Sequence, residues 1–316
     1  MNNVWLGIDT SNYTTSVSAV VSDGTFFNIK KPLCVKPHER GVRQSDAVFM
    51  HVKNLPEAMS DVMKCLEETY SNYYTIKAVG VSTKPRPVDG SYMPCFLSGV
   101  SVASALSSAL NVPLYEFSHQ EGHIRAALYG AHIDIPDRFY SFHLSGGTCE
   151  LLETVKDAEG FKCEIISESL DITLGQLVDR VGVMMGLPFP SGPHLETLAL
   201  NSRHKKKIVF SKISDVNLSG FENKAIKMYE DNTPPEEIAS FVYDVIVSAV
   251  SHMLEQRKDY NLPIVFSGGV SGSTILNKAI TKEYNAFFTA PSLSSDNAVG
   301  IAVLTKEKYE KVFLNV

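Results

Sequence analysis

Two histidines, His119 and His123, stand four residues apart in a stretch that also contains Ser118 and Glu121. If this stretch is helical, the spacing places both imidazoles on one face, where two ring nitrogens can share one metal ion. Ser118 is a favourable N-cap for such a helix. The same residues also fit a capped helix that carries two structural histidines, so the spacing alone leaves metal binding open.

The elements around the two histidines place them at the end of a strand. Residues 76–82 predict a buried strand, residues 96–110 a helix rich in small side chains, and residues 112–117 a short strand that leads directly into Ser118. This alternation predicts a βαβ unit. Open α/β sheets bind ligands at the carboxyl ends of their strands, which is where the histidines are expected.

Two hairpins in different halves of the sequence share one pattern. Residues 5–21 predict strand, hydroxyl-rich turn and strand, with Asp9 ending the first strand, and residues 139–152 repeat this with Ser-Gly-Gly at 145–147. Glycine lets backbone amides approach a phosphate, and Ser145 can add a hydroxyl. Ordinary hairpin turns explain each motif equally well. The repetition indicates duplicated halves around a cleft.

Three further positions carry groups that could bind a ligand. His143 alternates with two apolar residues in its predicted strand, so it must face away from both. Residues 262–273 predict a buried strand and a Gly/Ser loop before a helix, an arrangement whose free amides and dipole favour phosphate or ribose oxygens. Asp296, near the start of the last predicted helix, is either its N-cap or a ligand.

Composition limits the classes of protein that fit. The 316 residues, 44% hydrophobic and 20% charged, allow two globular domains, and the net charge of −6 argues against a broadly cationic surface for nucleic acid. The concentrated basic run, 203–207, is either a solvated face or an RNA phosphate contact. We expect a cytoplasmic protein without a membrane segment, because the start lacks a signal-peptide pattern and the five cysteines are scattered.

The order of these motifs resembles the actin, sugar-kinase and heat-shock ATPase superfamily. That resemblance implies an α/β fold of two ribonuclease-H-like halves around a nucleotide cleft, with domains at 1–117 and 118–316 and a terminal helix that could pack back on the first. Within it, the sequence resembles the tRNA threonylcarbamoyladenosine synthase subunit family, historically called glycoproteases, from Gly7 to about Leu304. The segments that carry the resemblance are 119–123, 145–147, 171–186, 190–193, 267–270 and 295–298.

The resemblance implies a set of site residues. In the family, two histidines and an aspartate hold iron or zinc, which assigns His119, His123 and Asp296 as metal ligands here. Some relatives add a tyrosine at the position of His143, so His143 is predicted as a fourth ligand. Asp9 and Ser11 of the first hairpin would be catalytic. ATP or threonylcarbamoyl-adenylate would contact residues of the second half, namely Ser145, Gly146, Gly147, Asp179, Gly192, Gly269 and Ser273.

The implied reaction is metal-dependent transfer of a threonylcarbamoyl group from threonylcarbamoyl-adenylate to N6 of adenosine 37 in tRNA. The partners would be an adenine nucleotide, tRNA and another family member in a hetero-dimer. The family's first turn reads Glu-Thr-Ser-Cys-Asp-Glu-Thr, whereas residues 9–15 read Asp-Thr-Ser-Asn-Tyr-Thr-Thr and lack two acidic residues. A non-catalytic scaffold or regulator that binds metal and nucleotide is therefore the alternative. A metalloprotease ranks third, because Glu121 stands one position later than in His-Glu-x-x-His.

Overall fold

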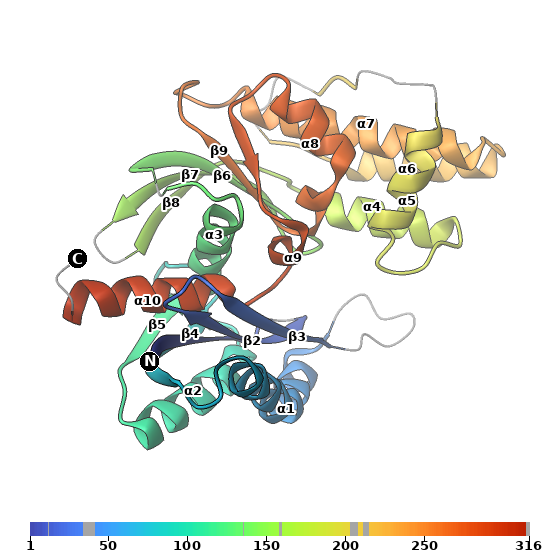
Figure 1. Ribbon diagram of the computed structural model, residues 1–316. Helices are drawn as coiled ribbons and strands as arrows, with labels where there is room; N and C mark the ends of the chain where they lie inside the picture. Colours follow the sequence, from blue (N-terminus) through green and yellow to red (C-terminus); the bar gives the residue numbers. More distant parts are fainter. Residues whose placement is uncertain are drawn as a thin grey trace. The chain divides into compact units, whose positions relative to one another are not determined.

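The computed structural model describes residues 1–11, 13–33, 42–134, 136–157, 160–202, 208–210 and 215–313 (Figure 1). The chain forms two compact units. The first unit consists of Met1–His132, Asp157–Phe161 and Asp296–Val316, and the second consists of Ile133–Lys156 and Lys162–Ser295. The histidine helix, which follows the predicted boundary at 117/118, belongs to the first unit in this division; the terminal helix also belongs to the first unit, as the resemblance allows.

The first unit contains a five-stranded sheet in the order β3-β2-β1-β4-β5. An antiparallel hairpin pairs β1 with β2 and continues to β3, while β1, β4 and β5 are parallel. The strands are β1 (Asn2–Asp9), β2 (Thr14–Val21), β3 (Phe26–Pro32), β4 (Tyr74–Lys84) and β5 (Leu114–Ser118).

Helices cover both faces of this sheet. Leu6 and Ile8 of β1 enter the core shared with α1 (Gln44–Tyr70) and α2 (Phe96–Leu110). The alternate residue Trp5 faces α10 (Val299–Phe313), where its ring meets Tyr309 edge-on. Because side chains alternate between the two faces of a strand and both faces are covered, β1 is buried almost throughout.

The second unit repeats the strand arrangement. Its sheet has the order β10-β9-β6-β7-β8, with β6 and β7 antiparallel and β6, β9 and β10 parallel. The duplicated α/β halves predicted from the two hairpins are thereby confirmed. The strands are β6 (Arg138–Leu144), β7 (Cys149–Asp157), β8 (Gly160–Glu168), β9 (Ile264–Ser267) and β10 (Ala286–Phe288).

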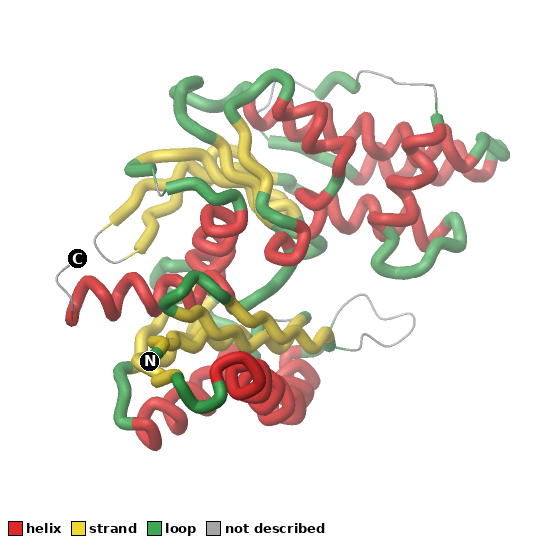
Figure 2. Tube along the Cα trace, in the orientation of Figure 1, coloured by secondary structure: helices red, strands yellow, loops and turns green. Residues whose placement is uncertain are grey.

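The core of the second unit lies between this sheet and a group of helices, which Figure 2 colours red beside the yellow strands. The rings of Phe142, Phe266 and Phe288 stack across three neighbouring strands, with centroids 4.7 and 4.2 Å apart. The helices are α4 (Leu174–Met184), α5 (Gly192–Asn201), α6 (Ser219–Glu230), α7 (Pro235–Leu254), α8 (Thr274–Thr281) and α9 (Pro291–Ser294), with a 3₁₀ turn, η1, at Gly269–Gly272.

By length and composition alone, α7 could cross a membrane, since its most apolar window has a mean hydropathy of 1.3. However, 67% of that window is buried inside the protein. The apolar residues Ile238, Val242, Val245 and Ile246 all lie in the core of the second unit. This burial is what a core helix of an α/β unit shows.

Candidate metal centre and nucleotide-binding residues

The histidine helix, α3 (His119–Gly130), begins directly after β5. Ser118 caps it: its hydroxyl accepts from the Glu121 amide at 3.2 Å, and Glu121 Oε2 accepts from the Ser118 amide at 2.7 Å. This reciprocal capping box satisfies two amides at the helix start. It also fixes where α3 begins, so that His119 occupies its first position and His123 the next turn on the same face.

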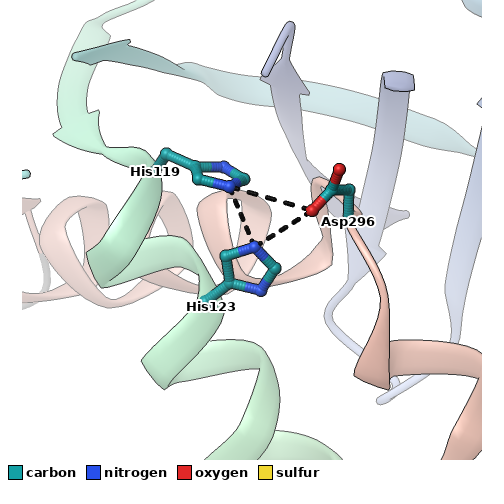
Figure 3. Close-up of side chains that lie close together, drawn as sticks. All are labelled: His119, His123 and Asp296. Atoms are coloured by element: carbon teal, nitrogen blue, oxygen red, sulfur yellow. Dashed lines mark hydrogen bonds and ion pairs between the residues drawn. The ribbon is translucent and has the colours of Figure 1, made fainter. Parts of the chain in front are cut away.

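His119, His123 and Asp296 direct their ligand atoms toward one another (Figure 3). The Nε2 atoms of the two histidines are 2.9 Å apart, and Asp296 Oδ1 lies 3.3 Å from Nε2 of His123 and 3.8 Å from Nε2 of His119. Ligands of a tetrahedral zinc site with bonds of about 2.1 Å are separated by about 3.4 Å. The three distances and the donor set, two imidazoles and one carboxylate, therefore fit a divalent transition metal.

Asp9 forms a hydrogen bond with Nδ1 of His119, the ring nitrogen that does not face His123. Its Oδ2 lies 2.6 Å from Nδ1 of His119, and its Oδ1 accepts from the Ser11 amide at 2.7 Å. A carboxylate that accepts from Nδ1 leaves the Nε2 lone pair for a metal, as in carboxylate–histidine–metal arrangements. Without metal, burial disfavours the charged forms of both Asp9 and His119. The attraction between the two charges outweighs this effect, so it lowers the pKa of Asp9 and raises the pKa of His119 to about 9.

The position of Asp296 depends on close packing at the start of α10. Gly300 lies against the backbone of α3, where an added Cβ would be 1.8 Å from the Gly122 carbonyl oxygen. Two residues after Asp296, the Ala298 amide donates to Ser16 Oγ of β2 at 2.9 Å. These contacts fix the segment that carries the carboxylate beside the two histidines within the first unit.

In the second unit, the Ser-Gly-Gly turn connects β6 to β7. Ser145 Oγ accepts from the amides of Gly147 at 3.3 Å and Thr148 at 3.0 Å, so the Gly147 amide already has a partner in its own turn. A Cβ added to Gly146 or Gly147 would meet no described atom within 4 Å. The turn is held by its own hydrogen bonds and by Thr173, which donates to the Gly146 carbonyl at 3.1 Å. The Gly146 nitrogen lies close to Gly175 of α4, whereas the Cβ positions of Gly146 and Gly147 are open to a ligand.

Gly268 joins β9 to η1 against the end of β6. Its φ is +91°, and an added Cβ would lie 2.3 Å from the Leu144 carbonyl oxygen, so a residue with a side chain does not fit there. By contrast, an added Cβ at Gly269 would meet no described atom within 4 Å. The close approach at one glycine and the open space at the next make the loop a candidate ligand surface.

Asp179 and Gly192 belong to α4 and the start of α5. Asp179 Oδ1 accepts from the Ser191 amide at 2.8 Å, and Tyr243 of α7 donates to the Gly192 carbonyl at 3.1 Å. Burial raises the pKa of the Asp179 carboxyl, although the Ser191 amide works against this shift. Since Oδ1 of Asp179 already accepts from the Ser191 amide, Oδ2 is the oxygen that could accept from a ribose hydroxyl.

Glu196 of α5 was not predicted as a site residue from the sequence, yet its carboxylate caps the start of α8. Its Oε1 accepts from Ser273 Oγ at 2.8 Å, Thr274 Oγ1 at 3.0 Å and the Ile275 amide at 2.8 Å. A carboxylate is favourable at a helix N-terminus, and here it takes the place that a phosphate could have taken. No local pattern marks Glu196, because its role arises from the packing of α5 against this loop.

Other expected site residues fall in different places. His143 alternates with the fully buried Phe142 and Leu144 and is itself only partly buried, which confirms the predicted orientation. Among the described residues, the group of possible metal ligands contains His119, His123 and Asp296 but not His143, whose role as a ligand stays a prediction. The basic run 203–207 and residue 12 of the first turn lie outside the described residues.

The sequence matches known proteins over most of its length. A model of the TsaD family, tRNA N6-adenosine threonylcarbamoyltransferase, matches residues 29–303. A protein of that name from Thermosipho africanus is 28% identical over 324 residues, covering 97% of this chain and 94% of the relative. Another from Helicobacter pylori strain P12 is 30% identical over 294 residues, covering 86% and 82%.

Solved structures with similar folds are much more distant in sequence. T. kodakarensis HypF has a TM-score of 0.59 at 11% identity, with coverage of 98% of this chain and 48% of that protein. A ROK family glucokinase from Streptomyces griseus, in complex with glucose and AMPPNP, has a TM-score of 0.52 at 11% identity, covering 96% and 99%. These structures confirm the predicted sugar-kinase-like fold. From the match over 29–303, the chain belongs to the tRNA N6-adenosine threonylcarbamoyltransferase family, whose members are named as transferases.

Proposed function

We propose that the protein transfers a threonylcarbamoyl group from threonylcarbamoyl-adenylate to N6 of adenosine 37 in tRNA. The family match over residues 29–303 is the observation that carries this proposal. The group formed by His119, His123 and Asp296 supports it, because two imidazoles and a carboxylate within 3.8 Å of one another suit a divalent metal. Iron and zinc are the candidate metals.

Each residue then has a role that its contacts allow. A metal held by His119, His123 and Asp296 would supply Lewis acidity toward carbonyl or phosphate oxygens of the acyl-adenylate. Asp9 keeps the proton of His119 on Nδ1, so that Nε2 faces the ligand position. In the second unit, we assign the amide of Gly146 to an anionic oxygen and Asp179 to the ribose hydroxyls.

A non-catalytic scaffold or regulator is the second candidate, and the first turn supports it. Family enzymes carry two acidic residues where this chain has Tyr13 and Thr14. The Tyr13 side chain is 41% exposed, and the described residues of the turn keep only the carboxylate of Asp9, which already binds His119. A scaffold would bind metal and adenine nucleotide tightly without forming product.

A metalloprotease ranks third. A protease of the His-Glu-x-x-His type needs a glutamate that activates water beside the metal. Here Glu121 Oε2 accepts from both the amide and the hydroxyl of Ser118, so the carboxylate caps the N-terminus of α3. Cleavage of a glycoprotein that is lost on His119→Ala would support this candidate.

Incorporation of labelled threonine into tRNA, with the adenylate-forming enzyme and partner proteins supplied, tests the transferase proposal. We expect wild-type product that is abolished in His119→Ala and His123→Ala, together with loss of bound metal. His132→Asn is the matched control, because this exposed histidine follows the same helix and has a φ of +55°, which asparagine tolerates. A protein that binds metal and nucleotide but forms no product would favour the scaffold. The metal content of His143→Ala tests whether His143 is the fourth ligand.

A further inference from the structure

His51 of α1 binds the end of the first hairpin through Thr15. Both side chains are fully buried, and Nδ1 of His51 lies 2.8 Å from Thr15 Oγ1, which also accepts from Asn54 Nδ2 at 3.3 Å. A hydroxyl that accepts from Asn54 still has its own proton to donate, and Nδ1 of His51 can accept it. This arrangement uses a neutral imidazole whose proton is on Nε2.

The hairpin presents different side chains to the two faces of the first sheet. Asp9 and Ser16 are directly opposed in the β1–β2 pair, and Ser16 Oγ accepts from the Ala298 amide on the α10 side. Since neighbouring residues of a strand point to opposite faces, Thr15 points the other way, toward α1. His51 therefore binds the end of β2 from the face opposite to the Asp9 carboxylate.

The turn between the two strands connects His51 to Asp9. The imidazole also interacts with the backbone of Ser11, whose amide donates to Asp9 Oδ1 at 2.7 Å. The other oxygen of Asp9 lies 2.6 Å from Nδ1 of His119. His51 thus contacts two residues of the turn, Thr15 and Ser11, and Ser11 in turn binds the carboxylate that orients His119.

Stability alone does not explain a histidine at this position of α1. A buried polar ring costs desolvation free energy, and Leu55, one turn further along the helix, shows that an apolar side chain can fill this core. What the imidazole adds is a hydrogen bond of fixed direction to the hairpin. That bond is useful where the position of the turn matters.

We propose that His51 is a positioning residue for the metal centre, because its neutral imidazole holds the first turn in the conformation that directs Asp9 to His119. This proposal rests on the proposed function, since it takes His119, His123 and Asp296 to bind a metal. His51 acts through the hairpin and Asp9 and is not itself a ligand.

The zinc affinity of the full-length protein, measured by competition with a chelating dye, tests this assignment. His51→Leu cannot bind Thr15, and we expect the affinity to fall about tenfold, at the lower end of the range for residues that orient a metal ligand. His51→Gln can still accept from Thr15 and should retain the affinity within about threefold. Thr15→Val should match His51→Leu, and the double variant should bind no more weakly than either, because both changes remove the same hydrogen bond.

Leu66→Ala is the matched control for a general loss of stability. Leu66 is fully buried in the same core but lies toward the other end of α1. Its truncation leaves a cavity, so urea unfolding of the metal-free protein should show a loss at least as large as in His51→Leu. The zinc affinity of Leu66→Ala should nevertheless equal that of the wild type.

Proton NMR of the metal-free protein at neutral pH gives a second measurement. The proton between Asp9 and His119 is in a short, charge-assisted hydrogen bond, so its signal should lie far downfield of ordinary imidazole protons. His51→Leu and Thr15→Val should shift this signal upfield or broaden it. Leu66→Ala should leave it in place.

Weaker zinc binding and a displaced signal in both His51→Leu and Thr15→Val, with neither change in Leu66→Ala, support the proposal. If His51→Leu does not fold, Thr15→Val carries the test. Wild-type affinity in the variants, an equal loss in Leu66→Ala, additive losses in the double variant, or no zinc binding by the wild type would overturn it.

The same measurements separate this inference from the transferase proposal. Zinc binding that depends on His51, in a protein that makes no modified tRNA, would keep the inference and reject transfer. Conversely, a wild-type protein that modifies tRNA, together with His51→Leu that binds zinc as tightly as the wild type, would keep the transferase and reject the role of His51.

Discussion

Asp9 is the residue on which the orientation of His119 depends. Its buried carboxylate, 1% exposed, accepts from Nδ1 of His119 and from the Ser11 amide. In Asp9→Asn, the side chain is neutral and no longer attracts the Nδ1 proton electrostatically. It therefore fixes the ring orientation less well and lowers the basicity of Nε2. We expect the affinity for zinc to fall about ten- to a hundredfold, measured by competition with a chelating dye.

The control for Asp9→Asn removes a carboxylate of the same unit that hydrogen-bonds to Tyr70 and Thr25 instead of to a histidine. Asp23 lies in the turn between β2 and β3 and accepts from Tyr70 and the Thr25 amide. Asp23→Asn should therefore leave zinc affinity unchanged. If Asp9→Asn binds zinc as tightly as the wild type, Asp9 does not orient the ligand.

The sequence indicated the candidate metal ligands better than the residues around them. The four-residue spacing indicates His119 and His123, and the family motif indicates Asp296, so all three could be found from local sequence patterns. Asp9 was predicted as catalytic, and its bond to a histidine 110 residues later could not be read from spacing. Glu196 left no signal at all, because a glutamate on a helix surface looks the same whether or not it caps a distant helix.

At the level of elements, the approach of α10 to α3 depends on Gly300. A Cβ there would lie 1.8 Å from the Gly122 carbonyl oxygen and 2.8 Å from the Ala126 amide nitrogen, both backbone atoms that cannot rotate away. We expect Gly300→Ala to lower the free energy of unfolding by about 3 kcal/mol or to prevent folding, as for severe overpacking. Urea unfolding measures this change, and zinc binding should weaken because Asp296 precedes the same helix.

Gly220→Ala provides the comparison. This glycine lies in α6, has no described atom within 4 Å of an added Cβ, and does not have a positive φ. Alanine should be neutral or stabilise the helix by up to about 1 kcal/mol. Equal stability changes in the two variants would show that the α3–α10 approach does not need glycine.

Element types followed from sequence more reliably than their ends. The apolar residues of α1 recur at helical spacing, but Pro56 in the sequence does not show whether one helix or two form there; α1 runs unbroken with Pro56 inside it. Asp171 is a favourable residue for a helix N-terminus, yet α4 begins at Leu174 with Thr173 as its cap, and Asp171 instead accepts from the amides of Leu218 and Ser219. Local propensity cannot show such long-range partners.

On the scale of the whole molecule, each unit has its own hydrophobic core, and His51 lies at the edge of the first. Its imidazole is fully buried on α1, with Nδ1 2.8 Å from Thr15 Oγ1. Burial lowers its pKa to about 4, although Asp9 and a bond to the Ser11 backbone oppose this shift. The folded protein therefore keeps His51 neutral where an unfolded chain would protonate it.

This difference makes stability depend on pH with a definite sign. Above the unfolded pKa of 6.5, both states are neutral and the stability is fully present; as pH falls from 6.5 toward 4, only the unfolded state gains a proton. From pH 7 to pH 5 we expect His51 to cost about 2 kcal/mol of unfolding free energy. Urea unfolding of the metal-free protein, followed at both pH values, measures the loss.

His51→Gln isolates this contribution because every other titratable group stays in place. Glutamine can still bond to Thr15, so the variant should fold, with lower stability at pH 7 and a flatter dependence between pH 7 and 5. The difference between the two slopes then belongs to His51, since Asp9, His119 and the other groups titrate in both proteins. Equal slopes would mean that the imidazole is protonated as readily in the folded first unit as in the unfolded chain, and that the bond to Thr15 does not depend on a neutral ring.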